Sequence, residues 1–313
     1  MKVSSNASRE LKNSADNSIQ WEKFGKLEFV DTNCPVCGGS QLSQKMKKSI
    51  KSYEMHFVRC ADCSTIYAKP RATEESLFNL YASDLFFEGK EDNINYYSYI
   101  DGYPYRMKTA RRRLSRLKSI APGKDLLEVA SAAGFFLKES KDQGLNPRGV
   151  EISAPMAKWS SKQWNVPVTA GSIEKIDLEP ASLDIIASWG VFTILRDPKS
   201  VLIKFNRALR TGGVLGLNTY YSESLWGKFW RQNWYILVLN TSQIFSKKAL
   251  LQLLDETGFE VVRLEREWQY ASPKYLLFQL LCHFPGATKN WLFDNIGWLE
   301  RINLPVPLPD VLQ

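Results

Sequence analysis

Residues 125–151 constrain the fold of this chain more than any other stretch. Asp125–Val129 has the apolar character of a buried strand, and the loop Ala130–Gly134 that follows consists of small residues only. A helix is predicted to begin at Phe135, and Arg148–Glu151 is predicted to form a second strand that ends in an acid. Strand, tight small-residue turn, helix and strand together form the opening βαβ unit of a nucleotide-binding fold.

The alternation of strands and helices continues to about residue 264. Four further strands are expected, at residues 166–168, 183–188, 214–218 and 259–264. Asp197 and Ser246 are expected to begin helices that run to Leu209 and Thr257. Alternating elements imply a parallel sheet with right-handed crossovers. We therefore predict an α/β fold, with a Rossmann-like sheet and helices on both of its faces.

The spacing of small residues in the loop distinguishes between nucleoside ligands. A dinucleotide site favours G-x-G-x-x-G, in which backbone amides face a pyrophosphate. Here Ala130, Ala132 and Gly134 follow a two-residue rhythm, and Glu128 stands two positions before the first of them. This arrangement suits a ligand with an ammonium group and no phosphate, and the carboxylate of Glu151 can accept both ribose hydroxyls of an adenosine. A dehydrogenase on the same sheet and an α/β crossover without a ligand are the alternatives.

Four of the five cysteines form two C-x-x-C pairs, Cys34 with Cys37 and Cys60 with Cys63. Each pair suits a tight turn that directs two thiolates at one point, and a tetrahedral site of four sulfurs favours zinc. The residues between the pairs are expected to form a hairpin, with His56 as an ordinary member of it. Four thiolates leave no open position, so the zinc is expected to be structural. Two disulfides or free thiols are the alternative.

Composition places the chain among folded globular proteins, with 44% apolar and 24% charged residues. No apolar run reaches the roughly 18 residues of a membrane helix. Residues 1–20 are rich in Ser, Asn and Lys and lack an apolar signal core, so we expect a disordered tail and a cytoplasmic protein. Cys282 lies in an apolar run and is expected to be buried. The basic cluster at residues 111–118 is interpreted as a solvated helix face or as a surface for an acidic partner.

Several segments, taken in order, resemble one known family. They are CPVCGG, VRCADCSTIYAKPRATEESLFNLYA, LLEVASAAGFFL, GVEIS, SLDIIASWGVF, LRTGGVLGL and FSKKALLQLLDETGFEVV. From about residue 30 to the end, the chain is similar to bacterial zinc-ribbon methyltransferases with a class I catalytic domain, of the surface-polysaccharide or small-molecule type. The resemblance implies S-adenosylmethionine as the cofactor and a structural zinc in the ribbon.

The resemblance also implies a role for individual residues. The implied cofactor-binding residues are Glu128, Ala130, Ser131, Ala132, Gly134, Glu151, Ile152, Ser172, Ile173 and Trp189. Those up to Gly134 would lie along the methionine part of the cofactor, and Glu151 would hold the ribose hydroxyls. The next three would contact the adenine, and Trp189 would close the site beside the sulfonium.

The chain departs from the family pattern at several positions. Family members often have Gly at the positions of Ala130 and Ala132, where each added methyl needs room beside the ligand. Thr193 and Ile194 stand where a Glu-His pair is common, and Thr241 stands where a His is common. The usual candidates for a general base or a substrate ligand are therefore missing. This keeps open a non-catalytic relative that acts as a binding or assembly partner.

We expect a methyltransferase that acts on a small molecule or a saccharide precursor. Tyr220, Tyr221 and Glu223 follow the fifth strand and are the candidates for substrate contact, with the start of a packed aromatic cap as their alternative role. An RNA methyltransferase that uses the ribbon and the basic cluster is a further alternative. Nucleic acid is the less favoured partner, because the basic cluster lacks interleaved aromatic residues. Peripheral membrane contact and the oligomeric state are left open.

The expected organisation has five parts. They are a disordered tail at 1–27, a zinc ribbon at 28–72, a helical linker or cap at 73–120, a cofactor-binding core at 121–265 with an aromatic cap insertion at about 220–245, and a C-terminal helical extension at 266–313. Pro305, Pro307 and Pro309 are expected to prevent regular pairing before Asp310. The last strand is therefore expected to be stunted or absent, which leaves part of its neighbour's edge unpaired or covered.

Overall fold

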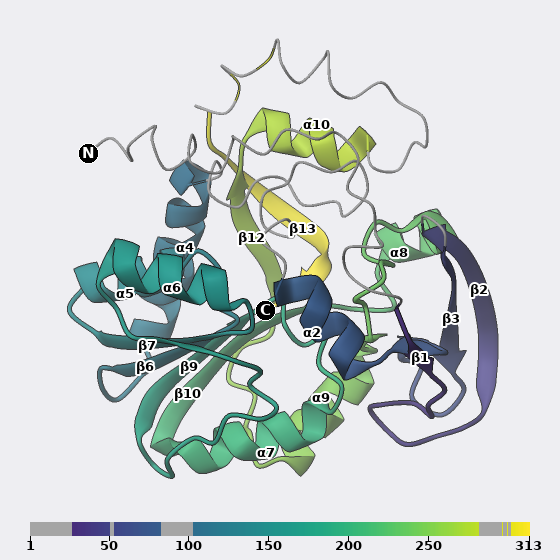
Figure 1. The fold of residues 1–313 in the computed structure, drawn as a ribbon, viewed down its shortest axis with the longest axis horizontal. Coiled ribbons are helices and arrows are strands. Elements are labelled where there is room, and N and C mark those ends of the chain that lie inside the picture. Colours follow the sequence, from purple (N-terminus) through teal and green to yellow (C-terminus); the bar gives the residue numbers. More distant parts are fainter. Residues whose placement is uncertain (1–26, 51–52, 83–102, 282–295, 297–298, 300–301) are drawn as a thin grey trace.

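A computed structural model describes residues 27–50, 53–82, 103–281, 296, 299 and 302–313. At its centre is a seven-stranded sheet in the order β12-β13-β10-β9-β6-β7-β8 (Figure 1). Its strands are β6 (Asp125–Val129), β7 (Asn146–Glu151), β8 (Val168–Ala170), β9 (Leu183–Trp189), β10 (Leu209–Tyr220), β12 (Arg266–Ala271) and β13 (Leu304–Leu312). Strands β10, β9, β6, β7 and β8 pair in parallel, and β13 runs antiparallel to both of its neighbours. The predicted Rossmann-like α/β fold is confirmed.

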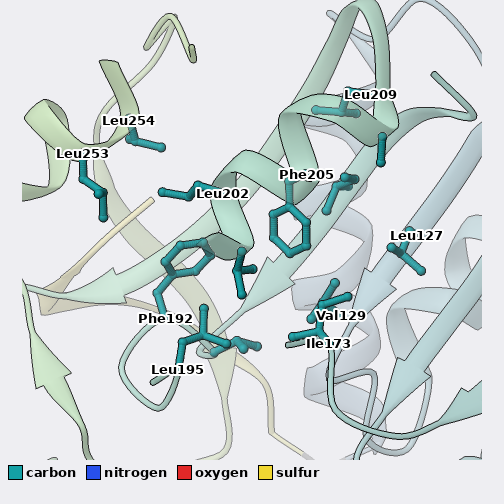
Figure 2. Packing of buried hydrophobic residues seen from close by; sticks show 14 of the residues in the cluster. Leu127, Val129, Ile173, Phe192, Leu195, Leu202, Phe205, Leu209, Leu253 and Leu254 are labelled. Carbon is teal, nitrogen blue, oxygen red and sulfur yellow. The ribbon is translucent and has the colours of Figure 1, made fainter. Parts of the chain in front are cut away.

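Helices cover both faces of this sheet (Figure 1). One face carries α4 (Tyr103–Lys118), α5 (Phe135–Asp142) and α6 (Ala154–Trp164), and the other carries α7 (Pro198–Ala208) and α9 (Lys247–Glu256). Side chains alternate along each strand, so successive residues enter different cores. Leu126 packs with α4 and α5, whereas Leu127 and Val129 pack with α7 and α9. Figure 2 shows this second core around Phe205.

Capping residues set the starts of the helices. Asp197 and Ser246 are the N-caps of α7 and α9, as predicted, and each side chain accepts a hydrogen bond from a backbone N–H three residues ahead. Ser153 caps α6 in the same way. Helices α7 and α9 end within one residue of the positions predicted from the sequence.

A second sheet, in which Cys60 ends β3, has the order β11-β4-β3-β2. Its strands are β2 (Leu42–Ile50), β3 (Tyr53–Cys60), β4 (Ile66–Ala68) and β11 (Gln243–Ile244), and the smaller pair β1 (Phe29–Val30) with β5 (Arg71–Ala72) lies outside it. The hairpin between the cysteine pairs is confirmed by β2 and β3. Strand β11 is distant in sequence from the other three strands, and its pairing with β4 is a connection that the sequence did not predict.

The aromatic segment at 220–245 packs on this second sheet. It contains α8 (Leu225–Trp230) and the 3₁₀ turn η2 (Arg231–Asn233). Trp234 and Leu237 share one buried cluster with Met55 and Phe57 of β3. The ribbon and the segment predicted as a cap on the core are therefore held together by a common apolar core.

The basic cluster on α4 is largely engaged within the chain. Arg111 pairs with Glu139, and Arg116 pairs with Glu265. Arg113 pairs with the fully buried Glu267. Three of these cations thus bind acids of the same molecule, an arrangement that the sequence did not indicate.

The C-terminal part of the sheet differs from the expectation. Residues 259–264 form no strand, and the sixth strand is β12, with α10 (Pro273–Leu281) after it. Strand β13 is a full strand, so the prediction of a stunted or absent last strand is wrong. Alternate residues of a strand donate to opposite neighbours, so prolines spaced by two remove donors from one edge only. The other edge pairs with β12 from Leu304 to Pro307.

The expected gap beside the last strand is present in part. Strand β13 pairs with β10 at Val311 and Leu312 only, opposite Tyr220 and Thr219. The earlier part of β10, from Leu209 to Leu217, and residues 258–265 line a groove of about 590 Å³.

Among the described residues, no helix is long and apolar enough to cross a membrane. The predicted disordered tail, apart from Leu27, and Cys282 lie outside the described residues. Leu27 itself is buried against the ribbon.

Candidate active site and metal centre

The four cysteines of the two pairs come together in one cluster. Their Sγ atoms all lie within 4.8 Å of one another. The Cys34 and Cys63 Sγ atoms are 3.6 Å apart, and those of Cys37 and Cys60 are 3.5 Å apart. A disulfide would require about 2.05 Å, so all four thiols are free. Sulfurs bound to one zinc at about 2.3 Å in a tetrahedron would be about 3.8 Å apart, so the donor set fits that ion.

Two equivalent backbone turns aim these thiols. The carbonyl of Cys34 accepts from Gly38 N at 2.9 Å, and the carbonyl of Cys60 accepts from Ser64 N at 3.1 Å. Gly38 and Ser64 occupy the same position after their pairs, and both have left-handed backbones, with φ of 74° and 62°. Glycine adopts this conformation freely and serine does not. The second turn is therefore strained where the first is not.

The pKa values of the thiols differ from one another. A hydrogen bond with Cys63, followed by burial, raises the pKa of Cys34 above its usual range. The same contact lowers the pKa of Cys63 to about 5, aided by hydrogen bonds from Thr65. Burial raises the pKa of Cys37 to about 11. The lowered pKa of Cys63 favours its thiolate form, which is the form that binds a metal ion.

The cluster is tied to segments that adjoin the central sheet. Ser246, the N-cap of α9, donates its hydroxyl to the Cys63 carbonyl at 2.5 Å. Arg59 of β3 donates to the Ser64 carbonyl at 2.9 Å and to the Ser222 carbonyl at 3.3 Å. The second cysteine turn therefore contacts the segments that follow β10 and precede α9.

The loop between β6 and α5 has an unusual backbone. Ala130, Ala132 and Gly134 all have positive φ, at 54°, 45° and 68°. An alanine in this region costs roughly 1–2 kcal/mol, so the two residues that replace glycine are held in a conformation that glycine would adopt without strain. The loop keeps the shape that the two-residue rhythm predicts despite the added methyl groups.

Glu151 ends β7 directly opposite this loop. Its side chain is almost fully buried, and its carboxylate accepts from Ala132 N at 2.7 Å and from Ser153 N at 2.9 Å. Burial raises the pKa of Glu151, and these backbone donors oppose the shift. The structure thus brings together the loop and the acid that the sequence assigned to one site.

Glu128 is the second acid of the site. Its side chain is buried on the α4 side of the sheet, and its Oε2 atom has no hydrogen-bond partner among the described residues. Burial raises the pKa of Glu128 well above its usual value, and the charge of Arg113 opposes this. A buried acceptor without a donor is costly, and a ligand with an ammonium group would satisfy it.

A small cavity of about 70 Å³ lies beside the loop. Its lining includes Ala130, Ile152, Ser172, Ile173 and Val191. These are apolar or small, as a flat adenine ring requires. The predicted adenine contacts therefore meet around one cavity.

Helix α2 (Glu74–Ala82) covers this cavity, which the sequence did not predict. Leu77 and Tyr81 of this helix are among the residues that line the cavity. The Tyr81 hydroxyl accepts from Asn240 Nδ2 at 2.6 Å, and its charged form is disfavoured by burial and by Glu151, so its pKa is raised. The apolar face of residues 74–82 was the available signal, but nothing in the sequence says what this face packs against.

Trp189 lies on the α4 side of the sheet. Its ring is 5.5 Å from that of Phe136, edge to face, and the Arg113 guanidinium lies 4.5 Å from its centre. Trp189 ends β9, which is beside β6. Its predicted place beside the sulfonium stays a prediction.

The three substrate-contact candidates point to different neighbours. The Tyr220 hydroxyl accepts from Tyr235 at 3.2 Å, and the Tyr220 ring packs against Trp234. Tyr221 forms a backbone bridge with Phe245. Glu223 accepts from Lys247 N at the start of α9. These contacts match the alternative interpretation, a packed cap, and a substrate role stays a prediction for all three.

The positions without the expected Glu-His and His have structural contacts. The Thr193 carbonyl accepts from Ser242 N and Gln243 N, and the Ser242 hydroxyl donates to the Ile194 carbonyl. The Thr241 hydroxyl donates to the Ile236 carbonyl at 2.5 Å. These residues therefore hold the cap against the loop after β9.

Sequence and structure comparisons address the family. Residues 99–264, just over half of the chain, match the family described as a methyltransferase domain. A malonyl-[acyl-carrier protein] O-methyltransferase of Serratia marcescens is 28% identical over 123 residues, which are 38% of this chain and 48% of that protein. The chain thus spans about half the length of this curated relative.

Solved structures with a similar fold include two bacterial proteins. One is a methyltransferase of Thermotoga maritima, described as a possible histamine N-methyltransferase, with a TM-score of 0.46 and 20% identity over 67% of this chain and 89% of that one. The other is a putative methyltransferase of Bacillus halodurans, with a TM-score of 0.47 and 16% identity over 64% and 95%.

The family match and the βαβ loop between two buried acids define the class of protein. The chain belongs to the class I S-adenosylmethionine-dependent methyltransferase family.

Proposed function

We propose that this protein binds S-adenosylmethionine along the loop Ala130–Gly134 and transfers its methyl group to a small molecule or a saccharide precursor. The observation that carries the proposal is the position of Glu151. This acid ends the second strand of the βαβ unit, is almost fully buried, and accepts from the loop at Ala132 N. A carboxylate there is placed to accept both ribose hydroxyls of an adenosine.

Other residues would bind the remaining parts of the cofactor. Glu128 would pair with the ammonium group, because it is a buried acid whose Oε2 atom lacks a donor. Ile152 and Ile173 would pack on the adenine in the small cavity. Helix α2 would exclude water from this end of the site through Leu77 and Tyr81.

The cofactor, when bound, supplies a methyl group activated by a sulfonium. The chain's contribution is then to fix the angle of approach and to remove water. The positions at Thr193 and Thr241 offer no general base, since their side chains and carbonyls hold the cap. An acceptor that is already ionised, such as a carboxylate or an acidic hydroxyl, would need no base from the protein.

We also propose that a structural zinc binds to Cys34, Cys37, Cys60 and Cys63. The support is the common distance range of the four sulfurs and the absence of a disulfide among them. No step of the transfer is assigned to this ion, because four thiolates complete its coordination.

Calorimetry with S-adenosylmethionine tests the function. We expect wild-type protein to bind the cofactor and Glu151→Ala to bind it much more weakly, with the exposed Glu179→Ala as the matched control. Release of S-adenosylhomocysteine is then measured with a panel of sugars and carboxylic acids, because the Serratia relative is named as an O-methyltransferase. Wild-type protein that binds no cofactor would overturn the proposal, and binding without release on any acceptor would favour the non-catalytic alternative.

A further inference from the structure

A buried ion pair joins α4 to β12 at the cofactor end of the sheet. The Arg113 Nε atom donates to Glu267 Oε1 at 2.7 Å, and its Nη2 atom contacts the same oxygen. The Glu267 side chain is completely buried, and that of Arg113 is 16% exposed. Because both charges are removed from water, the pair is stable only if its geometry is good and the remaining polar atoms have hydrogen-bond partners.

The second oxygen of Glu267 is also used. Glu267 Oε2 accepts from Asn218 Nδ2, and Asn218 Oδ1 in turn accepts from Gly190 N at 2.5 Å. Asn218 is near the end of β10, and Gly190 follows the last residue of β9. The ion pair is thus fixed to the carboxyl ends of two central strands, where ligands bind in sheets of this kind.

Arg113 also acts on Glu128, the acid proposed to bind the ammonium group. Its guanidinium lies 4.5 Å from the centre of the Trp189 ring. Trp189 ends the strand beside β6, and Glu128 is on β6. Glu128 is two residues after Leu126, which packs on the α4 side, so alternation along the strand places Glu128 on that side as well.

The charges of this region are unbalanced. Glu128 and Glu267 are both buried acids, and Arg113 acts on both of them, by contact with Glu267 and by its charge on Glu128. Glu267 has two partners for its carboxylate, whereas Glu128 Oε2 has none among the described residues. The Arg113 guanidinium is therefore paired with Glu267, and the Oε2 atom of Glu128 can still accept a hydrogen bond from a ligand.

We infer that Glu267 is a positioning residue for cofactor binding: it holds the Arg113 guanidinium and so keeps Glu128 available for the ammonium group of S-adenosylmethionine. The inference rests on the proposed function. Without the charge of Glu267, Arg113 would pair with Glu128, the buried acid of β6 whose Oε2 atom has no donor among the described residues. The guanidinium would then compete with the ammonium group for one carboxylate.

The test compares two ligands, S-adenosylmethionine and 5′-methylthioadenosine, which lacks the amino-acid part. In Glu267→Gln, we expect the Kd of S-adenosylmethionine to rise about tenfold, as for the loss of one charge-assisted contact. The Kd of methylthioadenosine should change less than twofold. In the control Asn218→Ala, which leaves the charges in place, the ratio of the two affinities should stay within twofold of wild type.

The double variant Arg113→Gln/Glu267→Gln decides between positioning and plain structural support. It replaces the ion pair by two neutral side chains of similar size, an exchange that buried pairs often tolerate, so it remains informative if Glu267→Gln alone does not fold. With the competitor removed, its ratio of affinities should return to within twofold of wild type.

Equal weakening of both ligands in Glu267→Gln, no weakening of either, or a selective loss of S-adenosylmethionine in the double variant would overturn the inference. Wild-type protein that binds neither ligand would instead show that the proposed function is wrong. The two failures are therefore distinguishable.

Discussion

The cysteine cluster and the cofactor loop are built in opposite ways. The cluster takes four identical donors from two short turns, and their Sγ atoms all lie within 4.8 Å of one another. The loop site takes unlike groups from β6, β7, the loop after β8 and helix α2, and under the proposed function each would contact a different part of the cofactor. Under the proposed function, the cluster would depend on a single ion, whereas the loop site would distribute its contacts along the cofactor.

This difference predicts how each site fails. Removal of one of four ligands from a closed metal site removes the ion and the folding energy that it supplies. Removal of one contact from a distributed site leaves the others in place. The cluster should therefore be lost in one step, and cofactor binding should be lost in graded steps.

The largest effect is expected at Cys60, which is completely buried. Cys60→Ser should reduce bound zinc from one ion per chain to none and unfold residues 30–70, while the central sheet stays largely folded. Because Ser246 donates to the Cys63 carbonyl, the first turn of α9 should also lose protection. Metal analysis and hydrogen exchange measure this. Cys282→Ser, which alters the cysteine outside both pairs, is the control and should keep its zinc; an unaltered zinc content in Cys60→Ser would refute the ligand set.

The next effect is expected at Glu151. Glu151→Ala removes a carboxylate that would accept two hydroxyls, which should weaken cofactor affinity by about 2–3 kcal/mol. Some binding should remain through Glu128 and the adenine cavity. Calorimetry gives the Kd, and wild-type affinity in this variant would show that the ribose lies elsewhere.

Which of these features the sequence could predict depends on how local their determinants are. The four cysteines and the strands from Asp125 to Trp189 were predictable, because turn spacing and apolar runs act within a few residues. Strand β11 was not, since two residues carry no period and their pairing with β4 is set by the tertiary fold. Residues 259–264 have the apolar character of a strand but form none.

In the candidate site, the contacts of Arg113 and of helix α2 could not be predicted for the same reason. Arg113 looks like a surface cation in the sequence, and only the position of Glu267, 154 residues further on, makes it a buried ion pair. Tyr81 lines the small cavity beside the loop because α2 packs near the residues after β8. Contacts between residues so far apart leave no pattern in either segment alone.

A smaller, pH-dependent effect is expected at Glu128. Burial raises its pKa, Arg113 lowers it and Glu151 raises it, so the free protein retains a proton above the usual carboxyl range. This group favours folding below its unfolded pKa and loses that contribution as the pH rises through the folded value. A ligand ammonium needs the ionised form, so cofactor binding should release a proton and tighten as the pH rises through that value.

Calorimetry in buffers of different ionisation enthalpy measures the protons released on binding. In Glu128→Gln, which cannot ionise, this release should decrease and the affinity should lose the corresponding pH dependence. An unchanged release in the variant would assign the proton to another group and separate Glu128 from the ammonium.

The smallest effect is expected from the loop itself, where two neighbouring alanines differ in backbone conformation. Ala132 has φ of 45°, and Ala133, which is completely buried, is not among the residues with positive φ. Ala132→Gly should relieve strain and offset the greater freedom of glycine in the unfolded chain, for a net change between zero and about 1 kcal/mol of stabilisation. Ala133→Gly should destabilise the protein by about 1 kcal/mol, since the unfolded chain gains conformational freedom, no strain is relieved and a buried methyl is lost.

Urea unfolding of both variants gives the difference in the free energy of unfolding. The backbone N–H of residue 132, which donates to Glu151, is kept in each variant. Equal destabilisation by the two substitutions would mean that the loop bears no strain at Ala132, and the alanines would then be as compatible with this site as glycine.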